Sequence, residues 1–299
     1  MIVFLTVRLL PGDIVDSIAK SAVLAGGGPV DREAIERVLG LDVPIYVQYA
    51  RWLGDIVLHG DLGDSLRSGE PVAAKIGSRL AVTFELGLIS IVMALLIGLP
   101  IGIYSAIRPD TIGDYLGRSV SITLIAIPSF WAATLVVLYP SIWWGWSPPM
   151  ELIPFSEDPL GNLGQFIIPS FVTGMWMSGV GMRMTRTMML EEMRKDHIRT
   201  AWAKGLGEGV VVTRHALKNA LIPVISIIGL ELPMLVAGAI IAEQIFALPG
   251  MGRLLLEALH GKDYTVISGV NLIIATAIVM SNLLVDLSYA YLDPRVRYS

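Results

Sequence analysis

Long apolar stretches alternate with shorter polar connections along most of this chain of 299 residues. A helix needs about 20 mostly apolar residues to cross the hydrocarbon core of a bilayer, because lipid offers the backbone no hydrogen-bond partners and a helix satisfies its own. Five stretches meet that requirement. They are residues 84–107, 119–146, 166–182, 220–241 and 264–285. The pattern predicts an all-α, polytopic membrane protein.

A sixth apolar stretch at the N-terminus has only half the required length. Residues 2–10 read IVFLTVRLL and are followed by the helix-breaking Pro11 and Gly12. We expect residues 1–12 to be the end of a first transmembrane helix, which makes six spans in total. Residues 13–82 are then an external loop, with amphipathic helices at 32–39 and 44–58, and residues 83–299 are the transmembrane domain. The second amphipathic helix carries aromatic residues, which is typical of a helix at the membrane interface.

The distribution of lysine and arginine predicts the orientation, because basic residues near helix ends stay on the cytoplasmic side. Residues 183–218 hold the main basic cluster, whereas the connection 147–165 has no basic residue. Both termini and the loop 183–219 are therefore expected in the cytoplasm. Arg253 and Lys262 lie in a loop that this orientation places outside, and they count against it.

Composition agrees with a chain that spans the membrane several times. Hydrophobic residues make up 54% of the chain and charged residues 16%, whereas globular proteins carry about 25% charged residues. The net charge of −4 gives no general attraction to nucleic acid, so we expect the lipid bilayer but no nucleic acid as a partner. The chain has no cysteine, which excludes disulfides, thiolate zinc sites and cysteine nucleophiles.

The basic loop 183–219 has a regular pattern of its own. Apolar residues recur at helical spacing over 188–205, the run KGLGEG follows, and residues 210–221 resume an amphipathic pattern. We expect a helix, a glycine-rich bend and a second helix that continues into the span 220–241. From composition alone, this loop is either a basic anchor on the inner side of the membrane or a docking element for a cytoplasmic partner.

Two sequence runs in this loop carry a family resemblance. Residues 196–206 read DHIRTAWAKGL, and residues 214–224 read RHALKNALIPV. Together they resemble the cytoplasmic signature loop of ABC importer permeases, in particular the dipeptide, oligopeptide and nickel importer family. Further similar motifs occur in the same order along the chain, namely LLPGD at 9–13, GDLGDS at 60–65, IAEQIF at 241–246, LPGMG at 248–252 and LDPRVRY at 292–298.

The resemblance implies a type I ABC importer permease-like fold and a set of partners. These are a second homologous permease subunit, two cytoplasmic ATP-binding subunits and an extracytoplasmic substrate-binding protein. It implies import of peptides, with nickel chelates or oligosaccharides as alternative cargoes. The loop would be the element that docks on the ATPases, through Arg199, Thr200, Ala201, Lys204, Gly205, Gly207 and Glu208. The broader family carries Glu-Ala-Ala where this chain has Arg199, Thr200 and Ala201, so no glutamate contact is carried over.

Polar or helix-bending residues inside spans are candidates for the transport route, because ionisable groups in a membrane are costly and usually face a cavity or a partner. Glu231 lies in the middle of span 220–241, and Pro233 follows it. We expect Glu231 on the route or at a subunit interface, with a structural hydrogen bond as the alternative, and Pro233 at a gate. Small residues at Gly98, Gly102, Gly174 and Ser178 have the four-residue spacing typical of close helix packing.

No catalytic motif accompanies these features. The sequence has no G-x-x-x-x-G-K-[ST], H-E-x-x-H or G-x-S-x-G, and its four histidines are scattered. We therefore predict a transport subunit that is not an enzyme, without cofactor or metal, with ATP hydrolysis in separate subunits. An ion-coupled secondary transporter is the alternative from another class, since it too would use an acid such as Glu231. It would usually show broken helices and inverted repeats, which this sequence does not clearly have.

Overall fold

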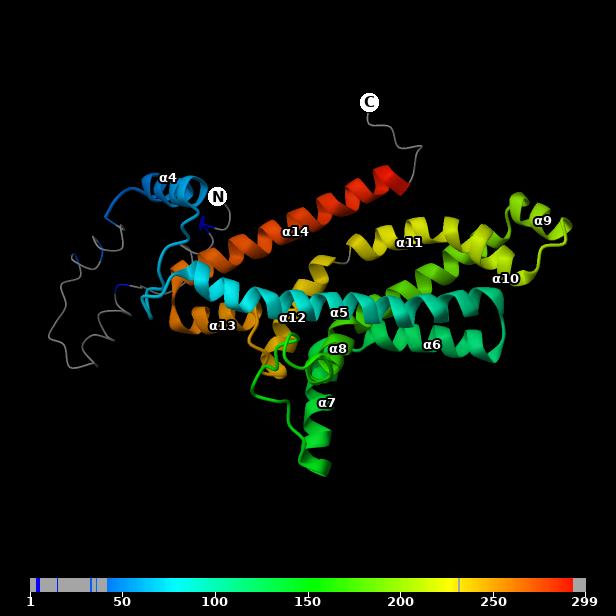
Figure 1. Cartoon of the computed structure of the whole chain (residues 1–299), viewed down its shortest axis with the longest axis horizontal. Helices are drawn as coiled ribbons and strands as arrows, with labels where there is room; N and C mark the ends of the chain where they lie inside the picture. The colour runs from blue at the N-terminus through cyan, green and yellow to red at the C-terminus, as the bar shows by residue number, and fades with distance from the viewer. Residues whose placement is uncertain are drawn as a thin grey trace. The chain divides into compact units, whose positions relative to one another are not determined.

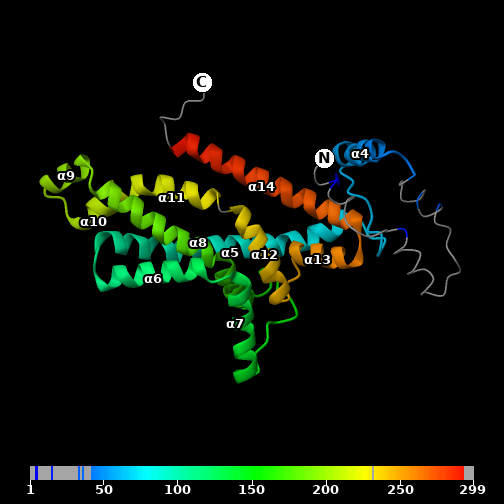
Figure 2. The same cartoon turned by 180° about the vertical axis from the view of Figure 1, so that it is seen from behind.

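The computed structural model of this chain describes residues 42–230 and 232–292, with Phe4, Leu5, Val15, Glu33 and Glu36 before them. The described residues are mostly helical and contain no β-strand, which confirms the all-α class (Figures 1 and 2). The expected half-span at 1–12 and the amphipathic helix at 32–39 lie essentially outside the described residues, and so does Glu231. In chain order the elements are α4 (Ile45–Gly54), η1 (Asp55–His59), α5 (Val72–Ile107), α6 (Ile112–Ala126), α7 (Ser129–Trp144), α8 (Pro159–Met193), α9 (Asp196–Ala203), α10 (Glu208–Val210), η2 (Val211–Leu217), α11 (Lys218–Leu230), α12 (Leu232–Ile245), α13 (Met251–Gly261) and α14 (Tyr264–Leu292).

The chain forms two compact units. One comprises residues 1–81 and 253–275, and the other comprises residues 82–252 and 276–299. The second unit holds most of α5, all of α6 to α12, and the C-terminal part of α14. Because the expected coupling loop and the pockets described below all lie in this second unit, it is the part that matters for function.

In the first unit, one buried carboxylate ties a loop to a helix. Asp263 accepts a hydrogen bond from the Ser65 hydroxyl at 2.5 Å and caps the first turn of α14 through the Val266 N–H at 3.3 Å. Ser65 closes the motif GDLGDS, and Gly63 within it approaches Thr265 so closely that an added Cβ would lie 3.0 Å from the threonine methyl group. The expected helix at 44–58 is also present, as α4 and η1. Its position at the membrane interface stays a prediction.

The structure corrects one expected span. Residues 119–146 do not form one helix, because α6 and α7 meet at an angle of 96° (Figure 1). Pro128 stands at the break, and Ile127 before it is extended, with φ −81° and ψ 122°. Proline disfavours the helical conformation of the residue before it, so the helix stops there.

Three described helical segments are long and apolar enough to cross a membrane, or four if α6 and α7 form one broken span. The three are Val72–Ile107, Glu208–Leu230 and Tyr264–Val285. The expected span 166–182 lies within α8, whose many small and polar residues reduce its hydropathy. The expected span 220–241 is divided between α11 and α12, on either side of Glu231. The total of six spans stays a prediction.

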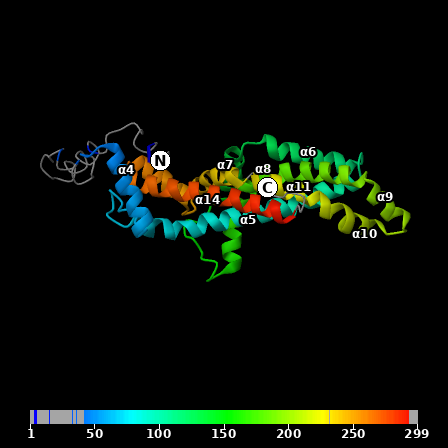
Figure 3. The same cartoon turned by 90° about the horizontal axis from the view of Figure 1, so that it is seen from above.

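Helix α8 is the centre of the second unit. It packs against α6, α7, α11 and α12, and its middle section from Val172 to Met182 is buried almost continuously (Figures 1 and 3). A helix that protein surrounds does not need the apolar surface that lipid requires. This placement explains why α8 carries glycine, serine and threonine in place of leucine and isoleucine.

Glycines let the backbone of α8 touch its neighbours, which confirms the expectation of close packing at these positions. A Cβ on Gly174 would lie 2.6 Å from the Ser90 carbonyl oxygen of α5, and one on Gly98 would lie 3.1 Å from the Ser178 carbonyl oxygen. On the α6 side, a Cβ on Gly179 would lie 2.8 Å from the Ser121 carbonyl oxygen. At Gly174 and Gly179 no side chain fits without a shift of the facing backbone, and at Gly98 the fit is tight.

A second buried carboxylate fixes the turn after α12. Glu243 is fully buried, and it accepts hydrogen bonds from the Thr83 hydroxyl at 2.5 Å and from the Gly252 N–H at 2.7 Å. It therefore holds the N-terminus of α13 where backbone N–H groups lack helical partners. This contact joins the motifs IAEQIF and LPGMG, and it also explains Gly250, where an added Cβ would collide with the carboxyl group.

The glycine contacts predict a large effect of side-chain volume at one position of α8. Gly174→Val should destabilise the protein by about 1–3 kcal/mol, because a backbone carbonyl cannot move aside to admit the side chain. Gly164→Val is the matched control, since nothing lies within 4 Å of a Cβ on this other α8 glycine. The midpoint of thermal unfolding in detergent measures both. Equal midpoints for the two variants would refute the packing account.

Candidate functional site

The loop expected to couple this chain to a partner forms a compact elbow at the end of α8, made of α9, the residues 204–207, α10 and η2 (Figure 3). One face of α9 is buried. Ile198 and Ala201 are 0% and 5% exposed, and they belong to one apolar cluster with Met189 of α8 and with Val211 and Ala216 of η2. The elbow is therefore packed onto the helices on both sides of it, and it is not a flexible tether.

The opposite face of α9 remains open. Arg199, Thr200 and Lys204 are exposed, and Trp202 is 43% exposed. Arg199 forms an ion pair with Asp196, one turn earlier at 3.4 Å, and both side chains are largely in solvent. An exposed face with a half-exposed tryptophan and unburied cations is a surface suited to docking.

The structure shortens the helix expected at 188–205. Helix α8 ends at Met193, and α9 begins at Asp196, with Lys195 between them in an extended conformation (φ −74°, ψ 152°). Acidic Asp196 in the first turn of α9 interacts favourably with the helix dipole. The apolar spacing continued across this break, so periodicity alone did not reveal it.

A buried acid stabilises the break between α8 and α9. Glu192 is 4% exposed, and its carboxylate accepts hydrogen bonds from Lys195 Nζ at 2.5 Å and from Asn219 Nδ2 of α11 at 2.9 Å. His197 Nε2 lies 3.1 Å from the same carboxylate. Burial alone would raise the pKa of Glu192, but these hydrogen bonds and the charge of Lys195 outweigh burial and lower it. Glu192 thus joins α8, α9 and α11 through one ionised group.

Gly205 ends α9 in a left-handed conformation with φ +77°. The Gly205 N–H donates to the Trp202 carbonyl at 2.9 Å, and the Leu206 N–H donates to the Ala201 carbonyl at 3.4 Å. This pair of bonds is the Schellman arrangement, which strongly favours glycine. Nothing lies within 4 Å of a Cβ added to Gly205 or Gly207, so the space beside both glycines is open. The expected glycine-rich bend is confirmed.

Glu208 has a partner within the chain. The two guanidinium Nη atoms of Arg108, just after α5, donate to the two carboxylate oxygens of Glu208 at 2.5 and 3.0 Å. This hydrogen bond and the charge of Glu208 raise the pKa of Arg108. The pair links the end of α5 to the start of the second helix of the elbow. No local pattern in the sequence indicates this pair, because 100 residues separate the partners.

The elbow continues directly into a long helix. Residues Glu208–Leu230 form one helical segment through α10, η2 and α11. The expected second helix at 210–221 is confirmed, although the part Val211–Leu217 has the wider π-helical winding. The elbow and α11 are therefore joined by one helical segment.

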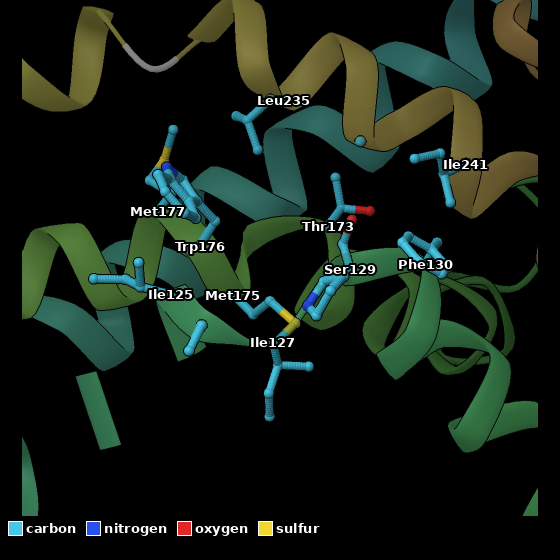
Figure 4. A pocket seen from close by; sticks show the side chains of 13 residues that line it. Ile125, Ile127, Ser129, Phe130, Thr173, Met175, Trp176, Met177, Leu235 and Ile241 are labelled. Carbon is cyan, nitrogen blue, oxygen red and sulfur yellow. The ribbon is translucent and has the colours of Figure 1, made fainter. Parts of the chain in front are cut away.

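A pocket of about 340 Å³ lies where the α6–α7 bend faces α8 and α12 (Figure 4). Residues 125–130 form one wall, Thr173, Met175, Trp176 and Met177 of α8 form another, and Leu235, Gly238 and Ile241 of α12 form the third. The only hydroxyl side chains among the lining residues are Ser129 and Thr173, and Thr173 donates to the Pro169 carbonyl. The lining of the pocket as a whole is therefore mainly apolar with few polar groups, a pattern typical of small-molecule sites.

The structure describes one of the two residues that we expected on the transport route, Pro233. Pro233 is half-buried in the first turn of α12, two residues before Leu235 of the pocket wall. Glu231 lies outside the described residues, so its role stays a prediction. Among the described residues, no group of three or more His, Asp or Glu side chains is arranged to hold a metal.

Comparison with known proteins gives the family. The model of the binding-protein-dependent transport system inner membrane component matches residues 98–298. A protein of Brucella abortus (strain 2308) named for a peptide transport system permease is 39% identical over 301 residues, covering 100% of this chain and 93% of that protein. The dipeptide transport system permease protein DppB of Escherichia coli (strain K12) is 36% identical over 321 residues, with 100% and 94% covered.

Two solved structures share the fold at low sequence identity. An inward-facing structure of the MetNI methionine ABC transporter matches with a TM-score of 0.59 and 17% identity, covering 73% of this chain and 96% of that one. An amino acid ABC transporter solved with histidines matches with a TM-score of 0.55 and 12% identity, covering 73% and 94%. The family resemblance read from the sequence motifs is confirmed, and the chain belongs to the family of binding-protein-dependent transport system inner membrane components, the permeases of ABC importers.

Proposed function

We propose that this chain is one of two homologous permease subunits of an importer that carries peptides across the cytoplasmic membrane. Two ATP-binding subunits hydrolyse ATP on the cytoplasmic side, and a substrate-binding protein delivers the peptide outside. The observation that carries this proposal is identity of 36–39% along the whole chain to relatives named for dipeptide or peptide transport. The chain itself performs no catalysis in this account.

The orientation follows from the elbow. We place α9 and the loop 183–219 in the cytoplasm with both termini, and residues 13–82 outside, where they meet the binding protein. We assign residues 1–12 to the first span and residues 83–299 to the permease domain. The basic residues of the elbow, which favour the cytoplasmic side, support this placement.

In this account the open face of α9 receives the force of ATP binding. Arg199, Thr200 and Lys204 contact the ATPase, while Ile198 and Ala201 keep α9 attached to the permease. The Glu192 contacts and the continuous segment Glu208–Leu230 carry the displacement into α11 and towards α12. The wall of the pocket formed by α12 then moves, with Pro233 at its start as the gate.

The pocket is suited to varied peptides. A peptide importer must accept many side chains, and an apolar wall with two hydroxyl groups imposes little side-chain chemistry. Glu231, if it borders the route, would interact with the peptide amino group. Nickel chelates, oligosaccharides and an ion-coupled mechanism are the outcomes that the tests below separate from peptide import.

The direct test is purification of the tagged chain from its own membranes, followed by an ATPase assay with and without the binding protein. We expect a second permease and two ATP-binding subunits to purify with it, with ATP hydrolysis stimulated by the peptide-loaded binding protein. A lone chain that transports under an ion gradient would overturn the proposal.

The docking surface is tested at the two open glycines. Gly207→Trp should reduce peptide uptake by about tenfold or more, because a bulky ring at the interface separates α9 from the ATPase. Gly207→Ala is the control, since it fits the open space and the ordinary φ of −66°. Gly205→Trp should act similarly, with Gly205→Ala controlling for strain in the left-handed conformation. Normal uptake by both tryptophan variants, present in the membrane at wild-type amounts, would remove the coupling role of this bend.

The Glu192 network is tested through stability and pH. Glu192→Gln should lower stability by about 1–3 kcal/mol, because Lys195 and Asn219 lose a charged acceptor. Since the pKa of Glu192 is lowered in the folded protein, its contribution is present above the pKa of an unfolded glutamate and is lost as pH falls through the folded pKa. The difference in unfolding midpoint between wild type and variant should therefore narrow in acid. Exposed Glu191→Gln should leave the midpoint unchanged; an equal effect of both variants would contradict a special role for Glu192.

The pocket is tested by cysteine labelling, which is specific here because the chain has no cysteine of its own. Ser129→Cys places a thiol in the pocket wall, and Ser141→Cys places one on the exposed surface of the same helix, α7. During transport, a dipeptide should slow the reaction of a thiol reagent with the first variant and leave the second unaffected. Protection by a nickel chelate or an oligosaccharide, with none by peptides, would refute the proposed cargo.

A further inference from the structure

A second pocket in the same unit is lined by arginines. It has a volume of about 270 Å³ and lies between α5, α6 and α8. Arg118 of α6 and Arg183 and Arg186 of α8 line it, together with small and apolar residues, and no carboxylate is among the lining residues. The transport mechanism proposed for this chain does not involve this pocket.

One buried acid neutralises only part of the positive charge of these three arginines. Asp114 is fully buried, and its carboxylate accepts two hydrogen bonds from Arg186, from Nε at 2.7 Å and from Nη2 at 2.8 Å. The backbone N–H of Asp110 donates to the same carboxylate at 3.0 Å. Arg118 Nε lies 3.6 Å from the same carboxylate, which makes an ion pair without a hydrogen bond. Of the three arginines, the single carboxylate of Asp114 therefore accepts hydrogen bonds from Arg186 alone and leaves the donors of Arg118 and Arg183 unused.

The remaining two arginines have unused donors. Arg118 Nε is buried and donates no hydrogen bond to any residue that the structure describes, and its guanidinium carbon lies 4.5 Å from the Tyr115 ring centroid. Arg183 is exposed and forms no ion pair with the described part of the chain. Because both guanidinium groups line the pocket and donate no hydrogen bond within the described part of the chain, an anion there would supply the acceptors that they lack. Guanidinium groups match the oxygens of a phosphate in particular.

The surroundings favour a phosphate attached to lipid. Next to the pocket, α6 exposes Leu116 and Ile122, which are 61% and 64% exposed, and Tyr115 at 55%. These side chains are suited to acyl chains, whereas a free phosphate would gain nothing from them. Basic pockets between transmembrane helices on the cytoplasmic side bind anionic headgroups.

We propose that the pocket between α5, α6 and α8 binds the phosphate of an anionic phospholipid headgroup through Arg118 and Arg183, with Arg186 held in place by Asp114. The lipid belongs to the leaflet on the side of the elbow, because Arg186 lies two turns before the end of α8. Placement of the pocket on the cytoplasmic side rests on the proposed function. Binding of the lipid is independent of cargo and of ATP.

The test uses the intact complex that purifies with the tagged chain. Native mass spectrometry in detergent counts bound lipid after titration with phosphatidylglycerol or phosphatidylcholine, with inorganic phosphate as a competitor. We expect retention of phosphatidylglycerol and a loss of affinity of at least about tenfold in R118Q/R183Q. R51Q/R79Q removes the same charge from the first unit and is the matched control. The single variant R183Q, at an exposed position, should give an intermediate loss even if the double variant is less stable.

The outcomes separate the two sources of phosphate. Weak competition by inorganic phosphate, together with loss only in the pocket variants, supports a lipid site. Displacement of the lipid by an equal concentration of inorganic phosphate would overturn the lipid assignment. Equal retention of phosphatidylglycerol by R118Q/R183Q and R51Q/R79Q would overturn the site itself, whether or not the complex transports peptides.

Discussion

Direct backbone contact between α8 and its neighbours is the constraint on which the functional unit depends. Gly174 and Gly179 leave no room for a side chain between α8 and the carbonyl groups of α5 and α6. Interiors packed at this density do not deform gradually, so in the proposed mechanism a force on one end moves α8 and its neighbours as a body. The elbow and the pocket both use α8 as a wall, and its packing connects them.

A few residues attach the elbow to the neighbouring helices. Ile198 and Ala201 anchor α9 by apolar contact, and Glu192 anchors it by charge. Gly205 then reverses the chain without adding bulk to the outer face. In the proposed mechanism, a short helix held in this way receives a push on its exposed side and passes it to α11.

Sequence reasoning succeeded where the determinant was local. Apolar length identified the helices, four-residue spacing of small residues identified the packing of Gly98 and Gly174, and glycine content identified the bend. It failed where a local signal was outweighed or absent. Apolar composition concealed the break at Pro128, and continuous periodicity concealed the end of α8. The pairing of Arg108 with Glu208 and the wall of the pocket bring distant parts of the chain together, and no local pattern encodes them.

Transmission of force to α11 depends on rigid attachment of the elbow to α8, and one distance measures this attachment. Spin labels at Thr187 of α8 and Ala203 of α9, two exposed positions in a chain without native cysteine, report the distance across the Glu192 junction in the purified complex. The account predicts a narrow distance distribution that is the same without nucleotide and in the ATP-trapped state. A shifted or second distance in the ATP-trapped state would show that the elbow hinges at Lys195, and would contradict transmission of force through a rigid junction.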